Sequence, residues 1–326
     1  MPKRFNHLYP KIHDFKHLLF CANAARKGTG WTHETSHFYF HLERQLLSLK
    51  DELESETYLP GAYRYFSILD PKPRMIAVAP FRDRVVHHAL VDLLTPIYEP
   101  RFIDDSYATR VDKGTHKAVL RCQHFLKRSP FYLKTDIRKF FDSVDHQVLL
   151  KLLEHRIKDK QLLLLIEKII FNVSNTGKGL PIGNLTSQFW ANVYLDPLDH
   201  YVKEVLQIKG YVRYMDDFVI FSQTGRVLNG LLDAIENFLE GQLKLRLHLG
   251  NTWLNTANHG LSFIGMRIWP HYIRTRSENW RRSQKKMHRR IKEFEQGKLN
   301  DDQISQSLQS IVGYHQRFKS SDNLLK

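Results

Sequence analysis

The sequence predicts an α+β fold, and two features of its pattern lead to this prediction. Segments with apolar residues at helical spacing are mixed with short runs of β-branched and aromatic residues, and the two kinds do not alternate regularly along the chain. The chain has 326 residues, enough for a large core with two or three subdomains. It has neither an internal repeat nor a long Gly/Ser/Pro linker. We therefore expect one core with a basic helical appendix.

The first third of the chain predicts helices around one hairpin. Residues 1–60 are mainly helical in pattern, with leucines at helical spacing in "FHLERQLLSLKDELES". Residues 62–80 predict strand, turn and strand, because both prolines of "DPKP" forbid a helix. Residues 81–99 predict a helix. Its apolar face carries Val86, Ala89, Leu90, Leu93 and Ile97.

The remaining elements also follow from local pattern. Residues 131–141 predict a strand that ends at Asp136 and leads into a helix, and a long helix over 187–206 precedes a second strand pair at 211–221. Asn/Gly turns separate "HLGNTWL" from "LSFIGMRIW". From Arg274 onward the sequence predicts a dense basic helix followed by a second amphipathic helix.

The charge balance predicts a polyanionic partner. Lys and Arg number 49 against 34 Asp and Glu, a net charge of +15. Nucleic acid fits this excess best and an anionic membrane second. A solvated basic face is the alternative that charge alone leaves open.

Compartment signals point to a reducing, cytoplasmic setting without membrane insertion. Two cysteines, Cys21 and Cys122, make no disulfide framework or metal-finger spacing. The N-terminal "MPKRFNHLYPKIHDF" has no apolar core of a signal peptide, and the apolar run at 162–166 is too short for a bilayer.

Adjacent carboxylates interrupt an apolar, strand-like stretch, "YVRYMDDFVIF" at 211–221. A hairpin turn there presents Asp216 and Asp217 at a sheet edge, and Asp136 also ends an apolar strand. Unpaired charges in such a setting are costly. An oxygen-rich cluster suits Mg²⁺, and two such ions serve phosphoryl transfer, with Mn²⁺ as a substitute. Without this context, "DD" after an aromatic residue is most often a plain turn.

Six segments together resemble the motifs of reverse transcriptases, in that family's order. "YMDD" at 214–217 resembles the catalytic hairpin, 133–144 and 179–199 resemble the palm motifs before it, and 261–269 resembles the primer-contacting hairpin. Residues 70–90 and 106–119 resemble the two fingers motifs. The resemblance implies a right-hand polymerase fold. Its expected parts are an N-terminal helical extension at 1–60, fingers at 61–130, a palm with interleaved fingers helices at 131–270, and a basic helical thumb at 271–326.

The resemblance also implies site residues and partners. The metal-binding and catalytic set is Asp136, Asp216 and Asp217, with the backbone of Ile137. The nucleotide-binding set is Lys72, Arg74, Phe141 as a steric gate against ribose, Ile182 and Gln188. The template and primer set is Arg110, which braces the template or the fingers, with Gly265, Met266, Arg281, Arg282, Lys285 and Lys286. The implied partners are template RNA, the cDNA or primer, and deoxynucleotides.

One departure from the family pattern indicates a subtype. In "LPIGNLTSQ" Ile182 replaces a Gln and Gln188 replaces a Pro, which resembles the enzymes of diversity-generating retroelements. That resemblance implies error-prone copying of a template-repeat RNA, with errors at adenines, mutagenic retrohoming, and a small basic accessory variability protein. A retron or group II intron enzyme, or a non-catalytic RNA-binding protein on the same fold, remains an alternative. Many relatives have Lys near Asn251, and its absence leaves a triphosphate contact open.

Two further segments have competing interpretations. The segment 274–298 carries ten Lys or Arg residues with Trp280 and Phe294 between them, which suits the backbone of an RNA–DNA duplex, although a solvated helix face has the same composition. "HETSH" at 33–37 matches a zinc-protease signature, with His41 continuing the row. Because it follows "KGTGWT", we expect it in a first helical turn, where it is a chance match.

Overall fold

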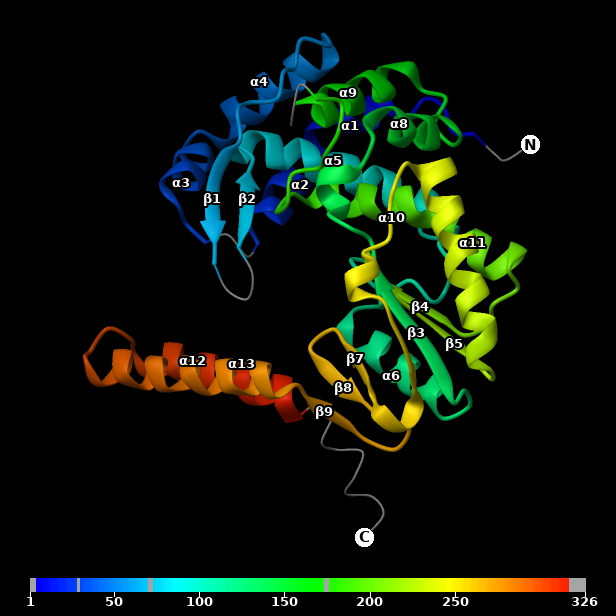
Figure 1. The fold of residues 1–326 in the computed structure, drawn as a ribbon. Coiled ribbons are helices and arrows are strands. Elements are labelled where there is room, and N and C mark those ends of the chain that lie inside the picture. Colours follow the sequence, from blue (N-terminus) through cyan, green and yellow to red (C-terminus); the bar gives the residue numbers. More distant parts are fainter. Residues whose placement is uncertain (1–3, 28–29, 70–72, 173–175, 317–326) are drawn as a thin grey trace.

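The computed structural model describes residues 4–27, 30–69, 73–172 and 176–316 (Figure 1). Helices from the N-terminal part form a layer in which α5 lies centrally, packed on α2 and α10. The helix α5 buries one face: Val86, Ala89 and Leu90 lie in the core, as the apolar spacing of this helix predicts. The helices of this layer are α1 (Tyr9–Ile12), α2 (Phe15–Arg26), α3 (His33–Phe40), α4 (Leu42–Glu54) and α5 (Phe81–Tyr98).

The central sheet is antiparallel with the strand order β4-β5-β3-β6. Its strands are β3 (Phe131–Asp136), β4 (Tyr211–Tyr214), β5 (Asp217–Ser222) and β6 (Trp253–Thr256). The strands β3 and β5 pair along their whole length, from Phe131 opposite Ser222 to Asp136 opposite Asp217. This register brings Asp136 and Asp217, which are 81 positions apart in the sequence, to the same end of the sheet.

Both faces of the sheet are covered, which explains why its strands read as nearly continuous apolar runs. In β5, Phe218 and Ile220 belong to one core cluster, while Val219 and Phe221 belong to the other. The first cluster joins the sheet to the helices, and the second joins it to α6 (Thr115–Leu126) and a small antiparallel sheet. That small sheet consists of β7 (Leu261–Phe263), β8 (Met266–Ile268) and β9 (Ile273–Thr275).

The helices between the strands contribute to the first core cluster, and two of them, α8 and α9, begin at side-chain caps. Asp145 accepts hydrogen bonds from the second and third backbone N–H groups of its helix, and Asp159 caps the following helix. These helices are α7 (Phe140–Ser143), α8 (His146–Glu154), α9 (Lys160–Phe171), α10 (Leu185–His200) with a π-helical turn at Tyr201–Val205, and α11 (Gly225–Leu243).

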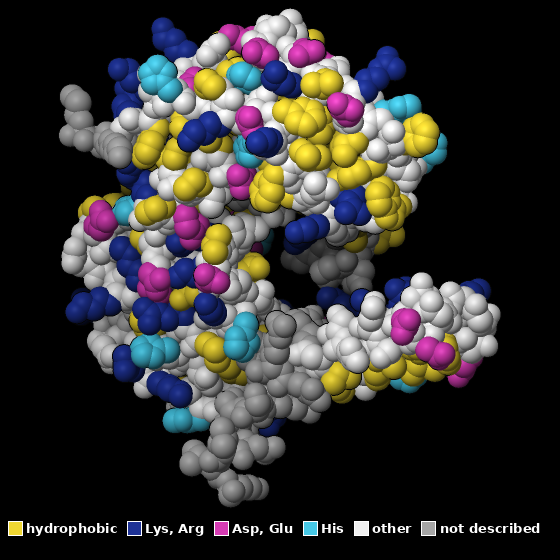
Figure 2. All heavy atoms as spheres, turned by 180° about the vertical axis from the view of Figure 1, so that it is seen from behind, with side chains coloured by type: hydrophobic (Ala, Val, Ile, Leu, Met, Phe, Trp, Pro, Cys, Tyr) yellow, Lys and Arg dark blue, Asp and Glu magenta, His cyan; other side chains and the backbone are white. Residues whose placement is uncertain are grey.

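Two projections flank an opening in the molecule. One is the hairpin of β1 (Arg64–Ile68) and β2 (Arg74–Val78), and the other is an arm of two helices, α12 (Ser277–Glu295) and α13 (Asp301–Gln316) (Figure 1). Figure 2 shows the opening between this arm and the helical layer, with Lys and Arg side chains at its rim. No residue of α12 is buried, so this helix is a protruding element rather than part of the core.

The structure confirms the α+β class, the hairpins at 62–80 and 211–221, and both C-terminal helices. The first core cluster runs from Leu8 to Leu247, so the N-terminal helices share a core with the sheet. The limits of the four predicted parts stay predictions. None of the helices in the described ranges combines the length and apolar character needed to cross a bilayer.

Candidate active site

The three predicted carboxylates lie at one end of the central sheet. Tyr214 pairs with Asp217, so Met215 and Asp216 form the two-residue turn between β4 and β5. Met215 has a φ of +56°, a left-handed conformation that is unfavourable for a side chain of this kind. Asp217 lies opposite Asp136 in the neighbouring strand, and Ile137 N–H donates to the Asp216 carbonyl at 3.2 Å.

Asp216 is held in an environment that disfavours its charge. Burial first, and then the negative charges of Asp217 and Asp136, raise the pKa of this carboxyl to about 6. The guanidinium of Arg74, on β2, opposes this shift. A group of carboxylates that repel one another is stabilised by a cation placed between them.

Asp136 is oriented by a neighbour that the sequence interpretation left open. Asn251 Nδ2 donates to Asp136 Oδ2 at 2.8 Å, and His248 N–H donates to the Asp136 carbonyl at 2.9 Å. The other carboxylate oxygen, Oδ1, is buried and accepts no hydrogen bond from the described residues; His248 Nδ1 lies 3.8 Å away. One oxygen is therefore fixed by an amide, and the other retains its capacity for a ligand.

Asp217 has a cationic partner of its own. Lys134 Nζ lies 3.2 Å from Asp217 Oδ1, and Lys134 comes two residues before Asp136 on the same face of β3. The described ranges contain no group of three or more His, Cys, Asp or Glu side chains arranged to hold a metal ion. The carboxylate oxygens nevertheless fit a hard cation. Asp136 Oδ1 is buried without a hydrogen bond from the described residues, and the raised pKa of Asp216 shows that its negative charge lacks compensation.

Residues on the predicted nucleotide side come from three segments that meet. Ala77 N–H, on β2, donates to the Ile182 carbonyl at 2.8 Å, and Leu180 N–H donates to the Phe141 carbonyl at 2.7 Å. These bonds bring the fingers strand, the loop before α10 and the predicted steric gate into contact with one another. Phe141 and Ile182 are both half-buried. The predicted residue Lys72 lies outside the described residues.

Gln188 lies on the side of α10 that faces α5. It lines a cavity of about 100 Å³ together with residues of α5 and of the 109–111 segment, and none of the predicted carboxylates lines this cavity. Asn192, one turn later on α10, lines the same cavity. Nothing in this geometry brings the Gln188 side chain to a nucleotide, so that role stays a prediction.

Arg110 acts as an internal brace. Its side chain is 5% exposed, and its Nε donates to Glu99 Oε1 at 2.9 Å. Further donors of the guanidinium reach backbone carbonyls of the 99–106 segment, among them Ser106 at 3.0 Å. Of its two predicted roles, this supports bracing of the fingers over a contact with the template.

The predicted template and primer residues differ in the exposure of their side chains. Met266 is fully buried in the second core cluster, so its side chain packs inside the protein. Gly265 has a φ of +77° in the β7–β8 turn, and its carbonyl accepts from Arg276 N–H at 3.1 Å. Any primer contact of this pair therefore falls to the backbone. The four predicted α12 residues, by contrast, are all exposed; they are Arg281, Arg282, Lys285 and Lys286.

The metalloprotease-like segment has a structural role. It begins α3 directly after the cap Thr32, as predicted for a chance match. Glu34 Oε1 accepts from Phe81 N–H at the start of α5, and Glu34 lies 3.8 Å from the guanidinium of Arg84. Glu34 thus connects α3 to α5 instead of serving as a base.

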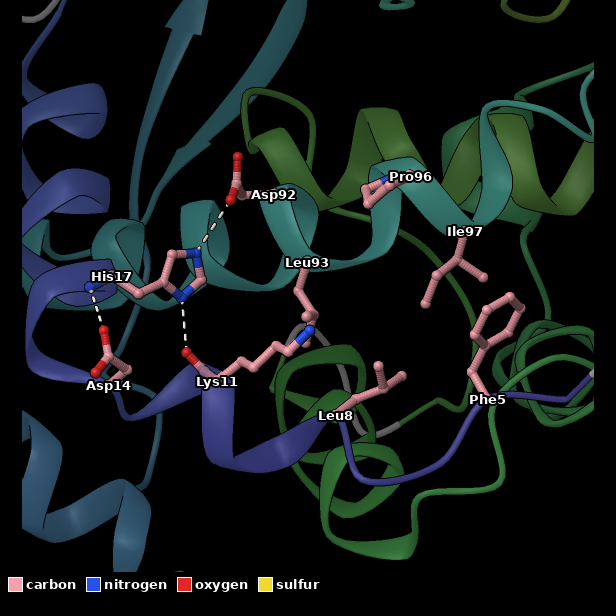
Figure 3. Close-up of a pocket in the computed structure, with 9 residues that line it drawn as sticks. All are labelled: Phe5, Leu8, Lys11, Asp14, His17, Asp92, Leu93, Pro96 and Ile97. Atoms are coloured by element: carbon pink, nitrogen blue, oxygen red, sulfur yellow. Dashed lines mark hydrogen bonds and ion pairs between the residues drawn. The ribbon is translucent and has the colours of Figure 1, made fainter.

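A larger cavity, of about 540 Å³, lies between the N-terminal helices and α5 (Figure 3). Its polar groups bond to one another: His17 Nε2 lies 3.1 Å from Asp92 Oδ2, and His17 Nδ1 lies 2.8 Å from the Lys11 carbonyl. Asp14 accepts from His17 N–H and caps α2. None of the predicted site residues lines this cavity, so its size does not mark it as the reactive site.

Comparison with known proteins identifies the family. The profile described as "Reverse transcriptase (RNA-dependent DNA polymerase)" matches residues 69–268, more than half of the chain. The chain belongs to the reverse transcriptase family. Membership confirms the predicted enzyme class, RNA-directed DNA polymerase, and the matched range contains every predicted carboxylate.

Two curated proteins and one solved structure illustrate the relationship. "Protein YkfC" of Escherichia coli (strain K12) is 28% identical over 281 residues, covering 72% of each chain. "Group II intron-encoded protein LtrA" of Lactococcus lactis subsp. cremoris is 30% identical over 177 residues, 51% of this chain and 29% of LtrA. An apo telomerase from Candida tropicalis superposes with a TM-score of 0.51 at 12% identity, covering 67% of this chain and 49% of that one. This likeness shows the fold alone and agrees with a right-hand polymerase.

Three residues beside the carboxylates were not among the predicted site residues. Lys134 is recognisable from its position two residues before Asp136 on the same strand face. Asn251 is adjacent to Asp136 only through tertiary pairing, since 115 positions separate the two. Arg213 left the clearest signal, a charged residue inside the otherwise apolar "YVRYM". It is fully buried beneath the turn that carries Asp216.

Proposed function

We propose that this chain extends the 3′-hydroxyl of a primer with deoxynucleotides on an RNA template at the Asp136, Asp216 and Asp217 site. The observation that carries the proposal is the register of β3 and β5, which sets Asp136 opposite Asp217 and next to the Asp216 turn within a reverse transcriptase domain. The unpartnered Asp136 Oδ1 and the repulsion at Asp216 support cation binding there.

Each protein group has a separate task in this proposal. Asp136 and Asp216 would hold two Mg²⁺ ions, with Asp217 and the Ile137 carbonyl in support. Bound divalent ions activate the attacking hydroxyl and stabilise the leaving oxygen. Asn251 orients Asp136 through Oδ2, and Lys134 partly neutralises Asp217. Arg74 supplies a fixed positive charge for the triphosphate from β2.

The exposed basic face of α12 binds the RNA–DNA duplex. Arg282, Lys285, Lys286 and Arg289 line a depression of about 360 Å³ on this face. Clustered cations of this kind bind the phosphate backbone with little sequence preference and strong salt dependence. The arm lies beside the opening seen in Figure 2, where a duplex leaving the sheet end can lie.

As to subtype, we propose the diversity-generating retroelement type, on the basis of Ile182 and Gln188. Ile182 lies beside β2, where a Gln side chain can bond an incoming nucleotide and an isoleucine cannot. The loss of one hydrogen bond lowers discrimination by roughly 0.5–1.5 kcal/mol, about tenfold at most. The product is then an error-prone cDNA of a template-repeat RNA, made with a small basic accessory protein.

A second candidate is a group II intron-type reverse transcriptase. The similarity to LtrA favours it, although this chain covers only 29% of that protein.

Sequencing the cDNA made by wild-type protein and by Ile182→Gln on one RNA template, base by base, separates the two candidates. Errors concentrated opposite adenine, reduced severalfold by Ile182→Gln, support the first. Faithful cDNA from the wild-type protein contradicts the first and leaves the second.

A further inference from the structure

A fully buried ion pair lies beneath the turn that carries Asp216. Arg213 and Asp199 are both 0% exposed, and they meet through two bonds: Arg213 Nε to Asp199 Oδ1 at 2.7 Å, and Nη2 to Oδ2 at 2.6 Å. Burial of two charges removes their hydration, which is costly unless every polar atom is paired. Tyr211 Oη also donates to Asp199 Oδ1, at 2.8 Å.

The third nitrogen of the guanidinium reaches the turn itself. Arg213 Nη1 donates to the Met215 carbonyl at 3.1 Å and to Asn192 Oδ1 at 3.2 Å. Met215 is the residue whose φ of +56° sets the direction of Asp216. A left-handed non-glycine residue persists only where surrounding contacts hold it, and strained positions of this kind cluster at functional sites.

The network is anchored on the helix that follows the nucleotide-side loop. Asp199 and Asn192 both belong to α10, and Asn192 Nδ2 donates in turn to the Ala108 carbonyl at 2.9 Å. The Arg213 backbone is fixed as well, since its N–H donates to the Asp105 carbonyl at 2.9 Å. Since α10 begins two residues after Gly183, one rigid element connects the Ile182 loop to the carboxylate turn.

We propose that Arg213, locked by Asp199 and Asn192, is a positioning residue that holds the strained Met215 turn and thereby aims the Asp216 carboxylate. The proposal rests on the proposed catalytic role of Asp216. Arg213 itself contacts no substrate: it acts through the Met215 carbonyl. The buried ion pair thus selects one conformation of the turn. An apolar pair of similar volume can fill the same space but cannot donate a hydrogen bond to the Met215 carbonyl.

The test replaces the pair by apolar residues in the full chain and follows the turn directly. Arg213→Met with Asp199→Leu removes both charges together, so no unpaired charge stays buried. The matched control is Arg101→Met with Asp196→Leu. Arg101 Nε donates to Asp196 Oδ2 at 2.7 Å, one turn earlier on α10, and among the described residues this pair makes no hydrogen bond to the β4–β5 hairpin.

Two readouts are compared, one of them independent of catalysis. Hydrogen–deuterium exchange of the peptide 211–221 in metal-free protein reports the turn, and primer extension reports the site. We expect exchange to be roughly tenfold faster and kcat roughly 10- to 100-fold lower, as for a catalytic group displaced by about 1 Å, with the KM for primer–template unchanged. The control pair should alter neither the exchange nor kcat.

Unchanged exchange of 211–221 in the Arg213/Asp199 variant overturns the proposal. So does faster exchange with wild-type kcat, and Asp216→Asn then locates the error. If Asp216→Asn is inactive, only the positioning role of Arg213 fails; if Asp216→Asn is active, the carboxylate assignment fails too. Should the double variant not fold, Tyr211→Phe removes one bond to Asp199 and keeps the ion pair. It should accelerate exchange in the same direction, and wild-type exchange would refute the proposal.

Discussion

Gly183 offers a quantitative test of how the loop before α10 is held against β2. It has a φ of +114°, and a Cβ there would lie 2.8 Å from Ile76 Cγ2 and 3.0 Å from the Ala77 carbonyl. Gly183→Ala therefore combines backbone strain with a collision against two adjacent residues of β2. We expect a cost of roughly 2–4 kcal/mol, from roughly 1–3 for the backbone and about 1 for the weakened Ala77–Ile182 hydrogen bond.

The strain is relieved by moving the loop away from β2, which displaces Ile182 from the nucleotide side. Gly183→Ala should therefore raise the KM for deoxynucleotides roughly tenfold, as well as lowering stability. Gly114→Ala is the matched control: Gly114 has a φ of +96°, but a Cβ there meets no atom within 4 Å. Steady-state primer extension over a deoxynucleotide titration, with thermal unfolding of both variants, measures the difference. Equal destabilisation by both substitutions with KM unchanged in each would refute the tight packing of this loop.

Three further predictions follow from the site. Asp216→Asn should stabilise the metal-free protein at pH 7 by at most roughly 3 kcal/mol. The folded-state pKa of Asp216 is about 6, so the free energy of unfolding of the wild-type protein falls as pH rises from about 4 to 6. Chemical denaturation of both proteins at pH 4 and 7 checks this, and an equal effect of the substitution at both pH values contradicts it. Asn251→Ala should lower kcat roughly tenfold with little change in duplex affinity, since it frees Asp136 Oδ2; single-turnover extension measures it, and an unchanged rate refutes the orienting role. Lys285→Ala with Lys286→Ala should reduce the salt slope of RNA–DNA duplex binding by roughly 1.5, and an unchanged slope would place the duplex elsewhere; filter binding at several salt concentrations decides.

Local chemistry made much of the fold predictable. In β5 successive residues enter opposite cores, so the strand is apolar throughout and was recognisable without alternation. The two prolines of 70–73 separated two predicted strands, and the pairing of β1 with β2 confirms that hairpin. The adjacent aspartates of 216–217 indicated the turn between β4 and β5. The strand end at Asp136 predicted its meeting with the hairpin, and the β3–β5 register confirms it.

What the sequence could not give depends on contacts between distant segments. Arg110 is a residue type that commonly contacts a template, yet its guanidinium donates to backbone carbonyls of the 99–106 segment inside the protein. Gln188 differs from the family pattern, but its side chain faces a cavity against α5. Asn251 and Lys134 became site residues only once pairing in the sheet placed them beside Asp136 and Asp217. Helical or strand periodicity carries no information on such pairs.

Primer extension on an RNA template, with purified protein, Mg²⁺ and all four deoxynucleotides, tests the reactive site when wild type is compared with Asp216→Asn. RNA binding is measured in parallel on both proteins. We expect DNA product from the wild-type protein, none from Asp216→Asn, and nearly equal RNA affinity for the two. Continued synthesis by Asp216→Asn would contradict the assignment of the β4–β5 turn as the reactive site.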